Sequence, residues 1–145
     1  MQHHNVFSLE PVIDRQPLTV TPETLLTEVI REMQEWANSC YLTVNNDASD
    51  TGSTRRINNS CALVIEDDQL QGIFTERDLV RLIATEQDLS GIAVGEVMSR
   101  ELITLTANGS EDIFMALNLL RQQQIRHLPI IDESGRLLGL ITEKN

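Results

Sequence analysis

Aromatic residues and positive charge are scarce in this chain of 145 residues, and each scarcity excludes a class of function. Aromatic residues make up 3% of the sequence, which leaves little material for platforms that stack single-stranded bases. The formal net charge is -11, and a surface of that sign repels a phosphate backbone. We therefore expect no nucleic acid among the partners.

Cysteine is rare, and long apolar runs are absent. Cys40 and Cys61 have neither the density of a disulfide scaffold nor a C-x-x-C spacing, so we expect two ordinary reduced thiols. The N-terminus has no basic segment followed by an apolar stretch, and no apolar run approaches the ~20 residues that span a bilayer. His3 and His4 are adjacent on a terminal segment and make a poor metal chelate. We expect a cytoplasmic protein with no membrane contact and no metal.

The common catalytic motifs are also missing. The sequence contains no G-x-S-x-G, no H-E-x-x-H and no G-x-x-x-x-G-K-[ST]. His127 is the one histidine outside the N-terminus, and its place between Arg126 and Leu128 is more typical of a packed or edge residue than of a general base. We expect no enzymatic activity.

An internal repeat organises the chain. Residues 63–78 align, with one inserted residue, on residues 129–145, and both copies have two apolar runs around an acidic turn, followed by Thr-Glu and a basic residue. Upstream, residues 12–21 align on residues 97–106. Short apolar runs bounded by acidic turns favour paired strands. The repeat unit is therefore a whole module.

Apolar residues at helical spacing separate these strands. In the first copy they are Leu25, Leu26, Val29, Ile30 and Met33, followed after the hairpin by Leu79, Val80, Leu82 and Ile83; in the second they are Ile113, Ala116, Leu117 and Leu120. Thr24 and Ser110 are the expected N-caps of the helices after the first strands. The residues of the second copy are expected to lie in the core or to form a dimer seam.

The pattern predicts an α+β fold of two β-α-β-β-α modules in tandem, packed with pseudo-two-fold symmetry. The first module spans residues 9–88 and carries a polar insertion at about 37–60. The second spans 89–145 and lacks its closing helix, so we expect either a fragment of a longer chain or a chain without an ordered tail. Arg55 and Arg56 in the insertion leave two interpretations open, a lid over phosphates or a solvated loop, and the polar composition favours the loop.

One segment of the first module allows both a structural and a functional interpretation. Thr75 and Asp78 are three residues apart at the start of a helix, the spacing of a capping box that only stabilises the helix. The same helix N-terminus offers N–H groups and a positive dipole end to a phosphate, while a carboxylate accepts ribose hydroxyls. Arg77 adds positive charge beside them.

The order of these elements resembles a known family. The segments Gly72-Ile73-Phe74-Thr75-x-x-Asp78 and Ile125-Arg126-His127-Leu128-Pro129, ahead of Gly139-Leu140-Ile141-Thr142, are similar to a pair of cystathionine-beta-synthase (CBS) domains, a Bateman-type regulatory module. The resemblance covers about residues 9–145 apart from the insertion. It implies clefts that bind adenine nucleotides, and a homodimer.

The resemblance also implies which residues contact the ligand. Ribose and phosphate contacts fall on Thr75 and Asp78, with Thr142 and Asn145 as their counterparts in the second module, and Arg77 is added to the candidate ligand contacts for its charge. Asn145 replaces the usual aspartate and loses a charge-assisted hydrogen bond, so the second site is expected to be weaker. The base-proximal contacts fall on Leu18, Thr19, Ala62 and Leu63 in the first module and on Ile103, Thr104, Arg126, His127 and Pro129 in the second.

The expected function is regulatory: a module that binds AMP, ADP or ATP between its two halves and passes the signal to an effector domain downstream in a longer chain. No covalently bound cofactor is expected. S-adenosylmethionine and a dinucleotide stay open as ligands. The alternative is a structural dimerisation module with empty clefts, in which Thr75 and Asp78 act only as a helix cap.

Overall fold

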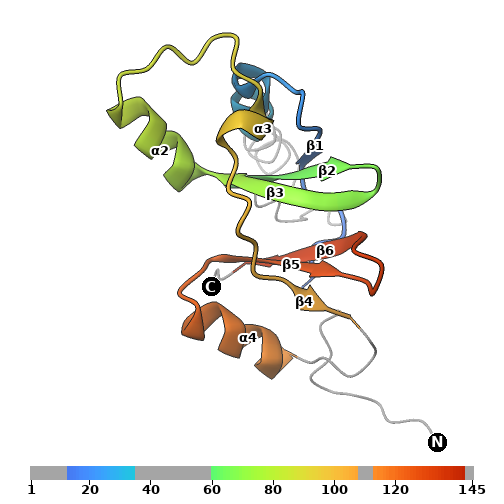
Figure 1. Cartoon of the computed structure of the whole chain (residues 1–145). Coiled ribbons are helices and arrows are strands. Elements are labelled where there is room, and N and C mark those ends of the chain that lie inside the picture. Colours follow the sequence, from blue (N-terminus) through green and yellow to red (C-terminus); the bar gives the residue numbers. More distant parts are fainter. Residues whose placement is uncertain (1–12, 35–59, 108–112, 143–145) are drawn as a thin grey trace, which may run out of the picture. The chain divides into compact units, whose positions relative to one another are not determined.

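The computed structural model describes residues 13–34, 60–107 and 113–142, which fall into two compact units (Figure 1). We call Pro17–Glu66 with Gln71–Glu101 the first unit. The second unit comprises Met1–Gln16, Asp67–Leu70 and Leu102–Asn145. Each unit carries one three-stranded sheet and its own core.

The first unit follows the expected order of elements. Strand β1 (Thr19–Val20) leads into a helix over residues 26–34, and the hairpin of β2 (Cys61–Glu66) and β3 (Gln69–Thr75) is followed by α2 (Glu76–Ala84). The sheet order is β1-β2-β3, with β1 parallel to β2. The helices and the sheet bury one apolar cluster, formed by Leu18, Val20, Leu26, Val29, Met33, Ala62, Val64, Phe74, Val94 and Met98.

The second unit repeats this arrangement. Strand β4 (Leu105–Thr106) leads into α4 (Ile113–Gln122), followed by β5 (His127–Ile131) and β6 (Leu137–Thr142), with sheet order β4-β5-β6. Its core consists of Leu105, Ala116, Leu120, Leu128, Ile130 and Ile141. A short helix, α3 (Val94–Val97), belongs to the first unit and precedes β4 along the chain. It was not expected from the sequence.

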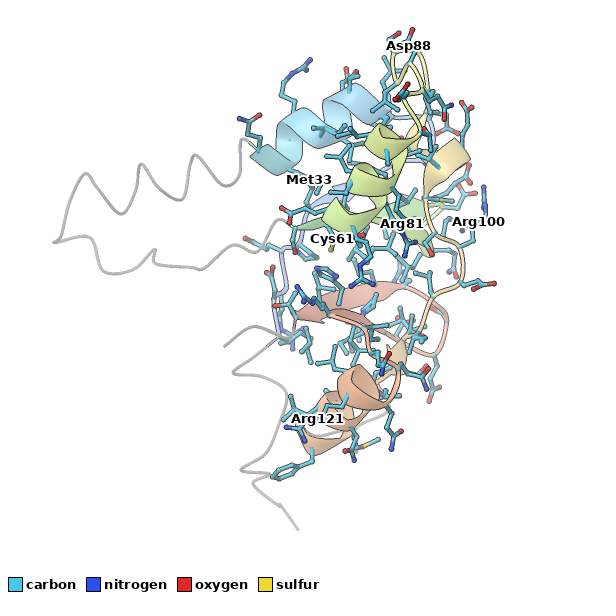
Figure 2. All side chains as sticks on the ribbon, turned by 90° about the vertical axis from the view of Figure 1, so that its left-hand side faces the viewer. Met33, Cys61, Arg81, Asp88, Arg100 and Arg121 are labelled. Atoms are coloured by element: carbon cyan, nitrogen blue, oxygen red, sulfur yellow. The ribbon has the colours of Figure 1, made fainter. Side chains whose placement is uncertain are left out.

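Helix ends carry compensating charge. Arg81 lies in the last turn of α2 and Arg121 in the last turn of α4 (Figure 2). The first turn of α2 carries Glu76 and Asp78. Acidic residues at the N-terminus and basic residues at the C-terminus oppose the partial charges of the helix dipole, which favours helix in these short segments.

The first strands of the two sheets have the same register but begin at positions that differ by one residue of the repeat. Val20 pairs with Val64 and the repeat-related Leu105 pairs with Ile130, so the register of the repeat is the same in both. In the first sheet the Leu63 N–H also donates to the Leu18 carbonyl at 2.9 Å. Pro129 occupies the equivalent position in β5 and has no N–H, so β4 begins one residue later than β1.

The hairpin turns absorb the inserted residue of the second copy. Asp67 and Asp68 connect β2 to β3 with φ angles of 54° and 63°, the left-handed conformations that a two-residue type I′ turn requires. The second turn is longer and uses Gly135 at φ 96°. A register shift between Ile130 and Ile131 accompanies the extra residue.

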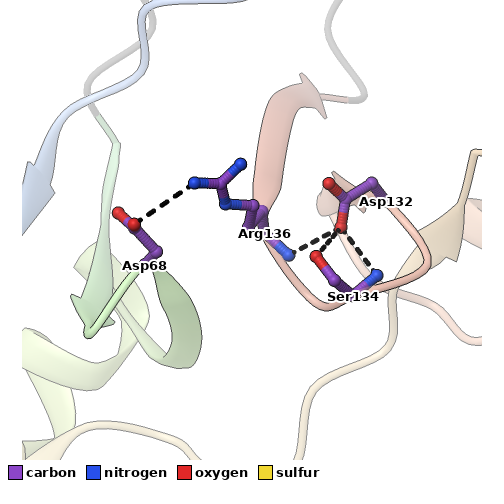
Figure 3. A network of polar contacts seen from close by, with 4 residues as sticks. All are labelled: Asp68, Asp132, Ser134 and Arg136. Atoms are coloured by element: carbon purple, nitrogen blue, oxygen red, sulfur yellow. Dashed lines mark hydrogen bonds and ion pairs between the residues drawn. The ribbon is translucent and has the colours of Figure 1, made fainter.

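A carboxylate holds the longer turn together. Oδ1 of Asp132 accepts hydrogen bonds from the Ser134 amide at 2.8 Å, the Ser134 hydroxyl at 2.7 Å and the Arg136 amide at 3.0 Å (Figure 3). Arg136 also reaches Oδ2 of Asp68 at 3.4 Å, with both side chains well exposed to solvent (Figure 3). The three hydrogen bonds to Asp132 restrict the conformations of the loop, whereas the exposed ion pair adds little to the stability of the protein.

Each sheet receives a backbone segment that precedes the other module in sequence. Ser99 bridges Ile73 of β3 in the first unit, and Asp14 bridges Leu140 of β6 in the second. The segments around Asp14 and Ser99 belong to the aligned copies 12–21 and 97–106. The two repeats therefore exchange equivalent segments, and neither unit is built from one sequence repeat alone.

Two expectations about the helices need correction. Thr24 is not the N-cap, because the helix begins at residue 26 and the Thr24 hydroxyl oxygen accepts from the Thr21 amide at 3.2 Å. Leu25 precedes the helix instead, in an extended bridge to Ala93. A dimer seam cannot include Ala116 and Leu120, which are 0% and 1% exposed, because both side chains lie in the second core.

The amphipathic pattern of α2 is only partly used inside the first unit. Leu79 and Leu82 pack against the first core, whereas Val80 and Ile83 are 65% and 59% exposed. The expected cap at Ser110 and the insertion at about 37–60, apart from Ser60, lie outside the described residues. The module boundaries 9–88 and 89–145 stay a prediction.

Candidate functional site

The junction of β3 and α2 places Thr75 and Asp78 together, as expected from their spacing. Thr75 is the N-cap of α2, with extended backbone angles φ -118° and ψ 169°. Its hydroxyl oxygen accepts from the Asp78 amide at 3.2 Å, and the Thr75 amide donates to Oδ2 of Asp78 at 2.9 Å. The Thr75 hydroxyl lies 3.1 Å from the same Oδ2 and donates to it. The capping box predicted from the sequence is confirmed.

The capping box also determines what the site offers to a ligand. The hydrogen bonds to the Asp78 carboxylate both use Oδ2, so Oδ1 has no hydrogen-bond partner among the described residues. Thr75 and Asp78 are half-buried, and Arg77 between them is exposed. The junction therefore presents a carboxylate oxygen held by the cap, a helix N-terminus and an exposed guanidinium within one short segment. These are groups that recognise hydroxyls and anions.

The edge strand β1 and the central strand β2 carry the other expected residues of that module, with Leu18 just before β1. Thr19 pairs with Leu63 across β1 and β2, and the Leu18 carbonyl accepts from the Leu63 amide. The side chains of Ala62 and Leu63 are 0% exposed and that of Leu18 is 6% exposed. Thr19 alone among these residues has an exposed side chain. Contact of a ligand with this edge stays a prediction, and the geometry favours Thr19 as its side-chain partner.

The expected residues of the second module are distributed along β5, β6 and the approach to β4. His127 and Thr142 are directly opposite each other in the antiparallel pair of β5 and β6. Pro129 is buried and Arg126 is exposed, while Ile103 and Thr104 are half-buried just before β4. Asn145 lies outside the described residues, so its pairing with Thr142 stays a prediction.

Sequence reasoning missed Met98 and Ser99, which lie directly against β3. A Cβ atom placed on Gly72 would come within 2.6 Å of the Met98 sulfur and 2.8 Å of the Ser99 carbonyl oxygen. Gly139 has the matching environment: a Cβ there would meet Ile13 Cγ1 at 2.6 Å and the Asp14 carbonyl oxygen at 2.9 Å. The signal was present in the sequence as two repeat-related glycines, and a close backbone approach explains why each position lacks a side chain.

The perturbed carboxylates lie away from this junction. The pKa of Asp132 is lowered, chiefly by the hydrogen bond from the Ser134 hydroxyl, and the Arg136 amide adds to the effect. The pKa of Asp88 is lowered by the Ser90 amide and then by the Ser90 hydroxyl. Both groups stabilise turns, so their pKa values mark local structure and do not indicate proton-transfer chemistry.

The described part of the chain contains neither a candidate metal site nor a helix that could span a membrane. Residues 13–34, 60–107 and 113–142 contain no group of three or more His, Cys, Asp or Glu side chains arranged to hold a metal ion. Cys61 is a buried thiol, and Cys40 lies outside these ranges. None of the helices in the same ranges is both long and apolar enough to cross a membrane.

The tandem α+β modules, each with a three-stranded sheet, define the class of fold, and family comparison identifies it. The CBS domain model matches residues 6–85 and 94–145, so this chain belongs to the CBS domain family. The resemblance inferred from the sequence and the α+β fold of paired modules are both confirmed.

Two curated relatives show how such a segment occurs in other proteins. Inosine-5'-monophosphate dehydrogenase of Thermoplasma acidophilum is 35% identical over 136 residues, which are 94% of this chain and 22% of that enzyme. A mitochondrial CBS domain-containing protein of Arabidopsis thaliana is 27% identical over 82% of this chain and 61% of its own length. The chain thus spans about a fifth of the dehydrogenase and under two thirds of the plant protein.

Solved structures show the same fold. An uncharacterized conserved protein of Pyrococcus horikoshii superposes with a TM-score of 0.70 at 24% identity, covering 96% of this chain and 89% of that one. A CBS domain protein of Pyrobaculum aerophilum, complexed with AMP, has a TM-score of 0.69 at 17% identity over 93% of this chain and 86% of that one. The cytosolic domain of the Mg2+ channel MgtE, in complex with ATP, has a TM-score of 0.66 at 19% identity over 95% and 46% of the two chains.

Proposed function

We propose that this chain is a non-catalytic regulatory module that binds an adenine nucleotide at the N-terminus of α2, with Thr75 and Asp78 as the central contacts. The observation that carries the proposal is the capping box, which holds Asp78 through Oδ2 and leaves Oδ1 without a partner among the described residues. A preorganised carboxylate oxygen accepts hydrogen bonds from a ribose without first losing side-chain entropy.

The remaining contacts divide by chemistry. The helix N-terminus and Arg77 suit the phosphate, and Thr19 on β1 lies on the sheet edge proposed for the base. Structural neighbours with AMP and ATP bound support an adenine nucleotide as the ligand class. Thr142, with Asn145, forms the proposed second and weaker site, together with Ile103, Thr104, Arg126, His127 and Pro129.

Regulation requires an effector, and the relatives indicate where to look. The match to the dehydrogenase covers 22% of that enzyme, which supports a module attached to a larger catalytic or transport protein. We place the module in the cytoplasm and expect ligand occupancy to favour one arrangement of the effector by differential binding, typically 1–3 kcal/mol.

The test compares two carboxylates that make the same kind of cap. Asp78→Ala removes the proposed ligand contact and a helix-capping bond, whereas Glu96→Ala removes only the bond from the Ala93 amide to Glu96 Oε2, 3.1 Å long, at the start of α3. Calorimetric titration of AMP, ADP and ATP into the full chain should show binding to the wild type. Asp78→Ala should weaken it roughly 10- to 100-fold, since a hydrogen bond to a charged group contributes about 1.5–3 kcal/mol.

The outcomes separate binding from capping. Wild-type affinity in Glu96→Ala together with weakened affinity in Asp78→Ala supports the nucleotide site. Equal affinities in all three proteins, or no heat with any nucleotide, would refute it. A saturating ligand at 100 times its Kd should also add about 2.7 kcal/mol of stability, visible as a rise in Tm.

Exposed apolar side chains favour a second function, homodimerisation. Val80 and Ile83 on α2, and Phe114 and Met115 on α4, are large hydrophobic residues between 43% and 65% exposed. Single exposed residues are ordinary, whereas contiguous apolar patches mark contact surfaces, and Val80 and Ile83 are three residues apart on α2 and so share one face of it. Light scattering of the wild type and of a Val80→Ser/Ile83→Ser variant tests this directly: a dimer that dissociates supports the function, and a monomeric wild type rejects it.

A further inference from the structure

The backbone around Ser99 is hydrogen-bonded to the strand that ends at the proposed ligand site. The Ile73 amide donates to the Ser99 carbonyl at 3.0 Å, and the Ser99 amide donates back to the Ile73 carbonyl at 2.8 Å. Ile73 and Thr75 belong to the same strand, β3, and Thr75 caps α2. The position of Thr75, the capping residue, therefore depends on a segment that lies beyond both β3 and α2 in the sequence.

Side-chain packing brings the Met98–Ser99 segment close to β3. Gly72 precedes Ile73 and is buried, with its missing Cβ position 2.6 Å from the Met98 sulfur and 2.8 Å from the Ser99 carbonyl oxygen. Met98 is 8% exposed and belongs to the same core as Phe74, which is fully buried and adjacent to Thr75. Side-chain packing and two backbone hydrogen bonds thus hold the Met98–Ser99 segment on β3.

The held segment leads directly out of the first unit. Arg100 follows Ser99 and donates from Nη2 to the Gly95 carbonyl at 3.2 Å, and the first unit ends at Glu101. Leu102 begins the part of the chain that belongs to the second unit. A change in the hold of Ser99 on β3 therefore occurs at the point where the chain passes from one unit to the other.

We propose that Met98 and Ser99 are positioning residues for the nucleotide site, and that ligand binding at Thr75 and Asp78 and pairing of Ser99 with Ile73 stabilise each other. This inference rests on the proposed function. Linkage requires the coupling to be reciprocal: a weakened bridge lowers affinity, and bound ligand strengthens the bridge. The device connects occupancy of the site to the segment that joins the two units.

The internal repeat supplies a matched control. Gly139 faces Ile13 and Asp14 as closely as Gly72 faces Met98 and Ser99. The Asp14 amide donates to Leu140 at 2.8 Å and the Leu140 amide donates to Asp14 at 2.9 Å. Gly139→Ala therefore damages an equivalent bridge at a similar structural cost, but it does so in the second unit and on the strand that leads to Thr142.

The experiment uses the full chain and AMP. Calorimetry compares wild type, Gly72→Ala and Gly139→Ala, and Gly72→Ala is expected to bind AMP about fivefold more weakly or worse. Gly139→Ala is expected to keep wild-type affinity at the stronger site despite a similar fall in Tm. Hydrogen exchange on the wild type, with and without AMP at a concentration that fills only the stronger site, needs no variant: the Ile73 and Ser99 amides should slow on binding, while the Asp14 and Leu140 amides keep their rates.

Each result decides a different point. AMP binding with unchanged exchange at Ile73 and Ser99 overturns the positioning role and leaves the nucleotide site intact. Equal losses of affinity in Gly72→Ala and Gly139→Ala also overturn it, because general destabilisation then explains both. Absence of AMP binding to the wild type overturns the proposed function and this inference together. If Gly72→Ala does not fold, the exchange measurement on the wild type decides alone.

Discussion

The two hairpins of the repeat differ mainly at their ends. The β2–β3 hairpin runs directly into α2, whose first turn holds Asp78 by three hydrogen bonds with Thr75. The β5–β6 hairpin ends at Thr142, which is opposite His127 on the neighbouring strand. Within residues 60–107 and 113–142, Thr75 is part of a preorganised cap with a carboxylate, and the equivalent Thr142 is described only by its pairing with His127. The two hairpins share their strand order, while the described residues around their last threonines differ.

Core substitutions should produce the largest differences between the two units. Phe74 and Ile141 are repeat-related and are 0% and 4% exposed. Phe74→Ala should cost about 3–5 kcal/mol, because it removes the larger side chain from the core of the first unit. Ile141→Ala should cost less, about 2–4 kcal/mol. Urea unfolding with a separate probe in each unit measures both, and equal losses would contradict a core that depends on Phe74.

Substitutions at Leu63 and Pro129 test why β4 begins one residue later than β1. Leu63→Pro removes the amide that donates to Leu18 and should destabilise the first unit by at least about 1–3 kcal/mol. Pro129→Val restores an N–H in β5 and should produce a newly protected amide at residue 129, as β4 extends to Thr104. Hydrogen exchange followed by NMR detects that amide, and rapid exchange at residue 129 would show that proline is not the cause of the offset.

The hairpin turns differ in their need for glycine, and the effect should be moderate. Gly135 has φ 96°, where a side chain is strained, and a Cβ there would also meet the Gln69 amide group. Gly135→Ala should therefore cost about 1 kcal/mol or more. Gly91→Ala is the control, since its φ of 81° carries the same strain with nothing near its Cβ position. A thermal unfolding series that shows equal losses would limit the effect to backbone strain.

The smallest effect concerns acid stability of the second hairpin. The Ser134 hydroxyl lowers the pKa of Asp132, so the folded state favours the carboxylate. A lowered folded pKa contributes stability that is present above the ordinary aspartate pKa and is lost as the pH falls through the folded value. Ser134→Ala should raise the pKa of Asp132 and shift this loss to higher pH. A carbon-detected NMR titration of the Asp132 carboxyl group measures the change, and an unchanged midpoint would exclude the hydroxyl as the cause.

Several features of the site followed from sequence spacing alone. Thr75 and Asp78 are three residues apart at the start of a helical pattern, and that local geometry is the same in any fold that contains the helix. The repeat alignment of residues 12–21 with 97–106 agrees with the structure, in which Val20 and Leu105 pair with the equivalent residues Val64 and Ile130. The Thr24 cap was wrong because a bridge between Leu25 and Ala93, distant in sequence, keeps the backbone extended for one more residue.

By itself the sequence determined the modular α+β fold, the hairpins with their acidic turns and the capping box, since all of these depend on local periodicity and short-range hydrogen bonds. Tertiary structure alone decided which segment covers each sheet. Ser99 pairs with β3 and Asp14 with β6 because Gly72 and Gly139 leave room for a close backbone. The partner that fills such a space is set by the path of the chain in three dimensions, and neither composition nor spacing encodes that path locally.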